Sequence, residues 1–318
     1  MSKIYMNREL KYIEKNLAQQ MQCEDMTLQK AAEHLLSSGG KRVRPLFVIL
    51  SSYLSNQHAS EDTYRVAVAL ELIHMATLVH DDVIDFSDKR RGKTTIEKEW
   101  NQSTAILTGN FLLARALEHL SPIENPQIHQ TLSKAIVEVC RGELFQFQDQ
   151  FRANQSITNY LRRIKRKTAL LIQLATEVGA MSGGANAQTV KTMRNIGYNI
   201  GMSFQIIDDI LDFTSSEKKL GKPVGSDLRN GHMTLPTLLE MKRDPKLKAR
   251  IESLNPNAPQ DTFELCVEQI RNSESIQLSQ QISERYLQKA NDLLATLPDS
   301  DAKPVFKKLI SKLKNRMS

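Results

Sequence analysis

Apolar residues recur along most of this chain at steps of three and four positions, the period of one buried helix face. The pattern is clearest from Glu61 to Asp85 and from about Val190 to Phe213. Weaker stretches predict helices at about 27–37, 44–55, 101–120, 125–151, 156–182, 234–253, 261–272, 274–296 and 302–315. The breaks between them carry Gly, Pro, Ser and Asn, which favour turns. The pattern therefore predicts an all-α protein.

Composition supports one helical domain. Thirteen Gly, ten Pro and 6% aromatic residues are few for a turn-rich β fold, and 318 residues with 40% hydrophobic content can bury a large core. Because no Ser/Gly linker or charged tail divides the chain, we expect residues 1–318 to form a single domain. No apolar run reaches the roughly 18 residues of a membrane span, so membrane contact is expected to be peripheral at most.

The three cysteines, Cys23, Cys140 and Cys266, lie far apart and are odd in number. They suggest neither a disulfide framework nor a zinc site, so the expected compartment is the reducing cytoplasm. The net charge of +7 is compatible with nucleic acid, an anionic membrane or a small polyanion. Since the basic clusters have almost no aromatic neighbours, nucleic acid is not the expected partner.

Both long helices end in the pattern Asp-Asp-x-x-Asp. The two blocks consist of Asp81, Asp82 and Asp85, and of Asp208, Asp209 and Asp212. A carboxylate among apolar residues costs several kcal/mol unless it is paired, and Mg²⁺ is commonly held by one or two carboxylates together with substrate phosphates. One block alone would equally fit a solvated helix face or a cap, but two blocks predict a Mg²⁺ site.

Basic residues near both blocks predict that the metal is bridged to an anion. Arg90 and Arg91 follow the first block, and their forked donors suit a diphosphate. Lys41 and Arg44 follow a Gly-Gly turn at a helix start, where free amides also favour an anion. Solvated charges at a helix end are the plainer interpretation of that segment.

In this order, the motifs resemble those of the trans-isoprenyl diphosphate synthases, the polyprenyl synthetase family. The resemblance covers roughly residues 30–240 and rests on Gly39-Gly40-Lys41-Arg42-Val43-Arg44-Pro45, His74 before the first block, Arg90-Arg91-Gly92, Lys167-Thr168, Phe204-Gln205, the second block and Gly221-Lys222-Pro223. Segments 72–82 and 139–143 resemble the catalytic subunit of bacterial medium-chain enzymes, heptaprenyl or hexaprenyl diphosphate synthase component 2.

The resemblance implies a helical bundle around a deep central cavity, with the aspartate blocks facing each other across its mouth. It implies Mg²⁺-dependent 1′-4 condensation of isopentenyl diphosphate onto an allylic diphosphate, with farnesyl diphosphate as the expected primer. The expected product has about thirty to thirty-five carbons and serves as a quinone side chain. A dimer is expected, either a homodimer or a heterodimer with a small regulatory subunit.

The resemblance also implies residue roles. Metal binding falls to the six aspartates, Asp81, Asp82, Asp85, Asp208, Asp209 and, in support, Asp212. The allylic diphosphate would be clamped by Arg90, Lys167 and Lys222, and isopentenyl diphosphate would be bound by Lys41, Arg44, His74 and Arg91. Thr168 and Gln205 would line the space where the carbocation forms. The sequence departs from many relatives at Asn110 and His232, and His80 has no assigned role.

Product length follows from the residues before the first block. Ala76 and Thr77 lie about 7 Å below Asp81 along the helix, where small side chains leave room for a growing chain. Ile73 and Leu70 continue this wall to a depth of about 16 Å.

Three rival functions remain at this stage. A shorter-chain, geranylgeranyl-type synthase would share the motifs. A terpene cyclase shares the first aspartate block, but its second metal motif normally mixes Asn, Ser or Thr and Glu. A non-enzymatic basic subunit would have no reason to keep both carboxylate blocks with matching cations.

Overall fold

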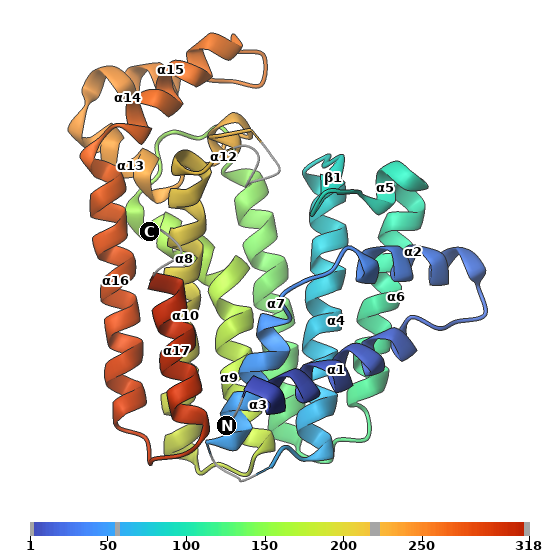
Figure 1. Cartoon of the computed structure of the whole chain (residues 1–318). Helices are drawn as coiled ribbons and strands as arrows, with labels where there is room; N and C mark the ends of the chain where they lie inside the picture. Colours follow the sequence, from blue (N-terminus) through green and yellow to red (C-terminus); the bar gives the residue numbers. More distant parts are fainter. Residues whose placement is uncertain (1–2, 55–57, 217–222, 315–318) are drawn as a thin grey trace. The chain divides into compact units, whose positions relative to one another are not determined.

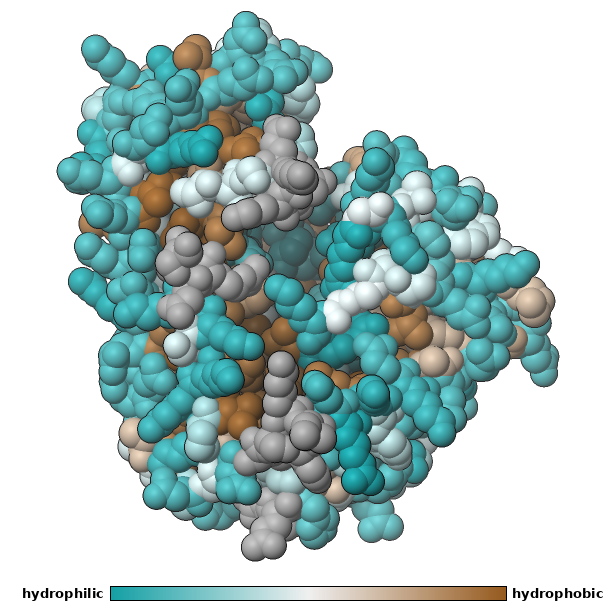
Figure 2. Space-filling model, viewed as in Figure 1, coloured by the Kyte–Doolittle hydropathy of each residue, from teal (hydrophilic) through white to brown (hydrophobic). Residues whose placement is uncertain are grey.

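The computed structural model describes residues 3–54, 58–216 and 223–314, and these residues are mostly helical (Figure 1). The prediction of an all-α protein is confirmed. None of the helices in these ranges is long and apolar enough to span a membrane. On the face shown in Figure 2 the surface is mostly hydrophilic, with smaller apolar areas.

The chain divides into two compact units, and we describe each by itself. Unit 1 comprises 1–132, 174–193 and 297–305, and unit 2 comprises 133–173, 194–296 and 306–318. Four helices run from one unit into the other: α7 (Pro126–Gln148), α9 (Leu170–Ser182), α10 (Ala187–Thr214) and α17 (Ala302–Lys314). The expectation of one domain over 1–318 stays a prediction.

Unit 1 is built around α4 (Glu61–Ile84). This helix packs against α6 (Gln102–Leu120), α3 (Val43–Tyr53) and α1 (Lys3–Gln20), while α2 (Met26–Ser37) packs on α6. In Figure 1, α4 and α6 run side by side. Residues 66–73 of α4 are buried all round the helix, which explains their nearly continuous apolar sequence. Helix α4 is therefore the buried centre of unit 1.

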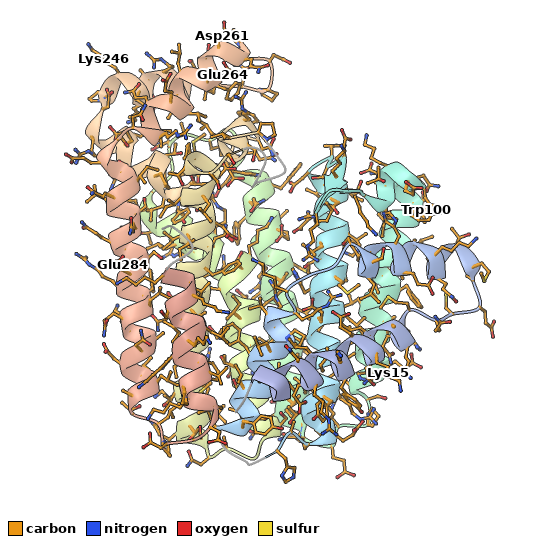
Figure 3. The ribbon with its side chains drawn as sticks, viewed as in Figure 1. Lys15, Trp100, Lys246, Asp261, Glu264 and Glu284 are labelled. Atoms are coloured by element: carbon orange, nitrogen blue, oxygen red, sulfur yellow. The ribbon has the colours of Figure 1, made fainter. Side chains whose placement is uncertain are left out.

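Short elements follow α4. They are the antiparallel strands β1 (Lys89–Arg90) and β2 (Lys93–Thr94) and the helix α5 (Ile96–Glu99). Trp100 caps α5, and its ring meets the edge of the His34 ring of α2 at 5.5 Å (Figure 3). His34 Nε2 also lies 2.8 Å from the Thr94 carbonyl of β2, a contact that holds the hairpin next to α2.

Unit 2 has its own apolar core, centred on Tyr160, Ile206, Phe213 and Leu235. Its remaining helices are α8 (Ile157–Ile164), α12 (Ser226–Arg229), α13 (Leu235–Arg243), α14 (Pro245–Glu252), α15 (Gln260–Arg271) and α16 (Glu274–Ala295). Gly201 of α10 lies against the backbone of Ala169, so close that a Cβ there would lie 2.5 Å from the Ala169 Cα.

The structure corrects several sequence-based boundaries. The helix expected over 234–253 is two helices, because Asp244 leaves the helical conformation before Pro245 and caps α14 by accepting from the amides of Lys246 and Leu247. The segment 156–182 contains a π-helical turn, η1 (Lys165–Ala169), between α8 and α9. Helix α1 and the short α5, α12, β1 and β2 were not expected.

Candidate functional site

The first aspartate block lies at the C-terminal end of α4, where Asp85 is the C-cap. Asp82 is buried and accepts hydrogen bonds from Arg90 Nε at 3.0 Å and Nη2 at 2.5 Å. Burial raises the pKa of Asp82, and the bond from Arg90 opposes that shift. Asp81 and Asp85 are only half-buried. The block thus has one carboxylate fixed by an arginine and two nearer to solvent.

A cationic cluster, formed by Arg44 and Arg91, surrounds His74, which lies about two turns before Asp81 on α4. Burial, followed by the charges of Arg44 and Arg91, lowers the pKa of His74 well below its ordinary value, so the imidazole is neutral at pH 7. Burial also lowers the pKa of Arg44 to about 10, which leaves it charged. Three of the four residues assigned to isopentenyl diphosphate are therefore neighbours, and the fourth, Lys41, is exposed on the same Gly-Gly turn.

The second block ends α10 and is held by a polar network within unit 2. Tyr160 Oη donates to one Asp209 oxygen at 2.6 Å and Gln205 Nε2 donates to the other at 2.8 Å. Thr168 Oγ1, in the π-helical turn, donates to Gln205 Oε1 at 2.5 Å. Burial and then the charge of Asp227 raise the pKa of Asp209 to about 7, against the two hydrogen bonds. Thr168, Gln205 and Asp209, which the sequence grouped only by resemblance, are thus connected.

Asp212 has a structural task. Its carboxylate is buried and accepts from Ser226 Oγ at 2.9 Å and the Asp227 amide at 3.1 Å, which fixes the start of α12. Its carbonyl also accepts from the Gly225 amide. Asp208 is half-buried. The supporting role in metal binding expected for Asp212 stays a prediction.

Lys167 pairs with Glu143 of α7 at 3.1 Å. Arg166, its neighbour in η1, pairs with Glu138 at 3.0 Å. A π-helical turn shifts side chains off the ordinary helical register and is frequent at functional sites. Lys222, the third cation assigned to the allylic diphosphate, lies outside the described residues.

The expected product-length residues all lie on α4. Leu70, Ile73 and Ala76 are buried, and Thr77 is half-buried with its hydroxyl donating to the His74 carbonyl at 2.8 Å. Their role in a product cavity stays a prediction.

The structure also places the residues left without a role. His80 packs on Gly109 of α6, where any Cβ would meet the imidazole ring. Asn110 is exposed, and the His232 amide donates to the Asp227 carbonyl at 2.8 Å.

Sequence reasoning missed the partners that hold these groups. Tyr160 and Glu143 lie 49 and 24 residues from the residues they bind, and no local pattern marks them. Arg42 belongs to a recognised motif but received no role, although it is buried and paired with Glu14 and Glu71. The buried polar character of these residues is visible only in the fold.

Each aspartate block has the donor chemistry of a Mg²⁺ site. In the described part of the chain, no three His, Cys, Asp or Glu side chains converge as a complete metal cage. Mg²⁺ needs only one or two carboxylates when substrate phosphates and water complete its octahedron. The half-buried carboxylates, Asp81 and Asp85 in unit 1 and Asp208 in unit 2, are hard oxygen donors of this kind, so the donors of each block fit Mg²⁺.

Comparison with known proteins agrees with the motifs. The family model described as polyprenyl synthetase matches residues 25–270. The chain belongs to the polyprenyl synthetase family. It is accordingly an enzyme, a prenyltransferase that makes prenyl diphosphates.

Individual relatives within the family are similar over nearly their whole length. Heptaprenyl diphosphate synthase component 2 of Bacillus subtilis is 46% identical, covering 94% of this chain and 85% of the relative. The crystal structure of heptaprenyl diphosphate synthase from Staphylococcus aureus is 58% identical, with a TM-score of 0.96 over 98% of this chain and 99% of that one. A polyprenyl synthase from Caulobacter crescentus, in complex with calcium and isoprenyl diphosphate, is 31% identical, with a TM-score of 0.91 over 98% of this chain and 96% of that one.

Proposed function

We propose that this prenyltransferase is a medium-chain trans-polyprenyl diphosphate synthase, which adds isopentenyl diphosphate to an allylic primer, farnesyl diphosphate, with Mg²⁺. The observation that carries the proposal lies on α4. Asp82, the carboxylate that is paired with Arg90, follows His74 and its cationic cluster by eight residues, about 12 Å along a helix. Two anion-binding regions of different chemistry, side by side, suit a reaction of two diphosphates.

The chemistry requires the allylic C–O bond to break, a C–C bond to form with isopentenyl diphosphate, and a proton to leave the new unit. Bound Mg²⁺ supplies positive charge to the departing diphosphate. Arg90 and Lys167 add fixed positive charge to the same leaving group, and Arg44 and Arg91 hold the second diphosphate. Thr168 and Gln205 present polar atoms toward the allylic cation. No protein nucleophile is needed, and the released diphosphate accepts the proton.

A divalent metal that prefers oxygen ligands is supported by the all-carboxylate donors and by the calcium in the Caulobacter crescentus relative, and we propose that this metal is Mg²⁺. Both ions favour oxygen ligands. Asp81, Asp82, Asp85, Asp208 and Asp209 are the proposed ligands, and Asp212 is proposed to support them by fixing the start of α12.

Product length is proposed as about thirty to thirty-five carbons. The small side chains of Ala76 and Thr77 below the first block support it, as do the heptaprenyl synthases among the relatives. A geranylgeranyl-type product is the alternative, and sizing the product separates the two. A quinone side chain as the product's destination and the cytoplasm as the compartment belong to the same proposal.

A dimer is proposed from two exposed apolar stripes. Leu107 and Leu117 of α6 and Val137, Leu144 and Phe147 of α7 are each more than half exposed. The α7 stripe repeats at alternating three- and four-residue steps, through Val137, Cys140, Leu144 and Phe147. On α6 the same steps join Leu107 and Leu117 through Asn110 and Ala114, so that stripe is interrupted by one polar residue. This is the spacing of a helix–helix seam. The name component 2 of the Bacillus subtilis relative suggests that the partner is a second subunit, and a further copy of this chain is the alternative.

Loss of the first block tests the proposed function. Asp81→Ala should reduce Mg²⁺-dependent condensation at least a hundredfold, because the metal loses an oxygen ligand. The matched control is Asp261→Ala, which removes an exposed carboxylate at the start of α15 (Figure 3) and should leave turnover unchanged. Full activity in Asp81→Ala would refute the metal role.

A further inference from the structure

Arg42 stands in the Gly-Gly-Lys-Arg-Val-Arg motif, yet its charge is already taken up. It is 5% exposed, and its Nε and Nη2 donate to the two oxygens of Glu14 at 2.6 and 3.3 Å. Its Nη1 donates to Glu71 Oε1 at 3.1 Å. One guanidinium thus joins α1 to α4 through the turn that begins α3. A fork satisfied on three nitrogens has little capacity left for a substrate.

The turn itself is held in an unusual conformation. Arg42 is the N-cap of α3 with φ 46°, a left-handed conformation that is unfavourable for a residue with a side chain. The two carboxylates hold its side chain, and its carbonyl accepts from the Leu46 amide at 3.0 Å. Arg44, which follows by two residues in the first turn of α3, is oriented by the direction in which this helix begins.

Arg42 also lies close to the second arginine of the site. A Cβ on Gly40 would be 2.7 Å from Arg91 Nη1 and 2.8 Å from Arg42 Nη1, so both guanidinium groups pack on this glycine. Arg91 Nη1 donates to the Gly39 carbonyl. Two cations this close repel each other unless one is neutralised, and Glu14 and Glu71 do that for Arg42.

Glu71 is the centre of this arrangement. It is 2% exposed, and its second oxygen, Oε2, has no hydrogen-bond partner among the described residues. Arg44 Nε is likewise buried and unpartnered among them. Glu71 interacts electrostatically with Arg42, Arg44 and Arg91. The single negative charge of Glu71 offsets one of the three positive charges, and the charges of Arg44 and Arg91 remain available to an anion.

We infer that Arg42 is a positioning residue, held between Glu14 of α1 and Glu71 of α4, that fixes the turn presenting Arg44 and Arg91 to isopentenyl diphosphate without binding it. The inference rests on the proposed function and adds to it that α1 controls affinity for one of the two substrates.

Steady-state kinetics with each substrate varied in turn test this role. Arg42→Gln should raise the KM for isopentenyl diphosphate about tenfold and leave the KM for farnesyl diphosphate within about twofold, since Asp82 and Arg90 are untouched. The KM of Arg42→Lys for isopentenyl diphosphate should lie between those of wild type and Arg42→Gln, because one ammonium cannot bond both carboxylates as a guanidinium fork does. A wild-type KM for isopentenyl diphosphate in either variant, or an equal rise in both KM values, would overturn the inference.

Glu14→Gln provides a variant that is safer for folding, because Glu14 is 45% exposed. It should raise the KM for isopentenyl diphosphate about threefold, whereas Lys15→Gln, the adjacent exposed position on α1, should not (Figure 3). If Arg42 were itself a substrate ligand, Glu14→Gln would free its guanidinium and lower that KM, which would contradict the inference. Calorimetric titration with isopentenyl diphosphate alone should rank the dissociation constants of these variants in the same order as their KM values. Failure of the wild-type protein to join isopentenyl diphosphate to farnesyl diphosphate would instead refute the proposed function.

Discussion

Asp209 shows how a single residue links the fold to the proposed metal chemistry. Its carboxyl is 2% exposed, lies near Asp227 and has a pKa of about 7, even though Tyr160 and Gln205 donate to it. A divalent cation must displace the proton from such a group before binding it. The metal affinity of this block is therefore expected to rise with pH through the neutral range.

The same carboxyl gives a pH-dependent stability in the metal-free protein. The folded pKa of about 7 lies above the ordinary value of 3.8, so this group stabilises the native state below pH 4 and the contribution is lost as pH rises through 7. Asp209→Asn removes the effect. Between pH 5 and pH 8, the free energy of unfolding of Asp209→Asn should therefore rise by about 2 kcal/mol relative to wild type. Urea unfolding without metal measures it, and a constant difference across this range would contradict the shifted pKa.

Gly201 allows helix α10 to pack closely against the π-helical turn η1. Gly201→Ala would improve helix propensity by about 1 kcal/mol in isolation, but the new methyl would meet the Ala169 backbone. Because backbone cannot move aside cheaply, we expect a loss of about 2 kcal/mol and a lower Tm. Thermal unfolding followed by circular dichroism decides, and a raised Tm would show that α10 and η1 are not closely packed.

Helix α4 carries the product-length prediction. Ala76→Phe places a ring one turn above Ile73 and before the first block, so the product should become shorter by one or more isoprene units. Radio-chromatography of the dephosphorylated products measures the length. An unchanged product distribution would refute the proposed wall, and Leu265→Phe, at an exposed position of α15 outside both apolar stripes, is a suitable control.

Most of these elements were predictable because their apolar period is strong. The helices containing the aspartate blocks were expected to within a few residues. Helix α1 was missed because only a thin stripe, including Met6, Ile13 and Leu17, is buried beneath a polar surface. The break at Asp244 is a local signal, a capping residue before proline, that the apolar period concealed.

The sequence motifs proposed the ligands of the site but not the residues that hold them. Aspartates and arginines stood in recognisable motifs, and the structure brings Arg44, His74 and Arg91 together, while their roles stay predictions. The supporting groups, Tyr160 under Asp209 and the Glu14 to Arg42 contact, join segments far apart in sequence. Such pairs have no spacing rule, since the fold alone brings them together.

At the scale of the whole molecule, the exposed apolar stripes predict assembly. A lysine in the seam, Leu144→Lys, should shift a dimer toward monomer because a charge would be buried at the interface. Leu265→Lys, at an equally exposed leucine of α15, is the matched control and should leave assembly unchanged. Light scattering during size-exclusion chromatography measures the mass. A dimer that tolerates Leu144→Lys would place the interface elsewhere.

The central claim is that this chain extends an allylic diphosphate by 1′-4 condensation to a medium-chain product. The direct measurement incubates the purified protein, alone and with a candidate partner subunit, with farnesyl diphosphate, labelled isopentenyl diphosphate and Mg²⁺, and then sizes the labelled products. We predict prenyl diphosphates of about thirty to thirty-five carbons that disappear when Mg²⁺ is chelated. Products no longer than twenty carbons, or label incorporation that survives chelation, would contradict the account.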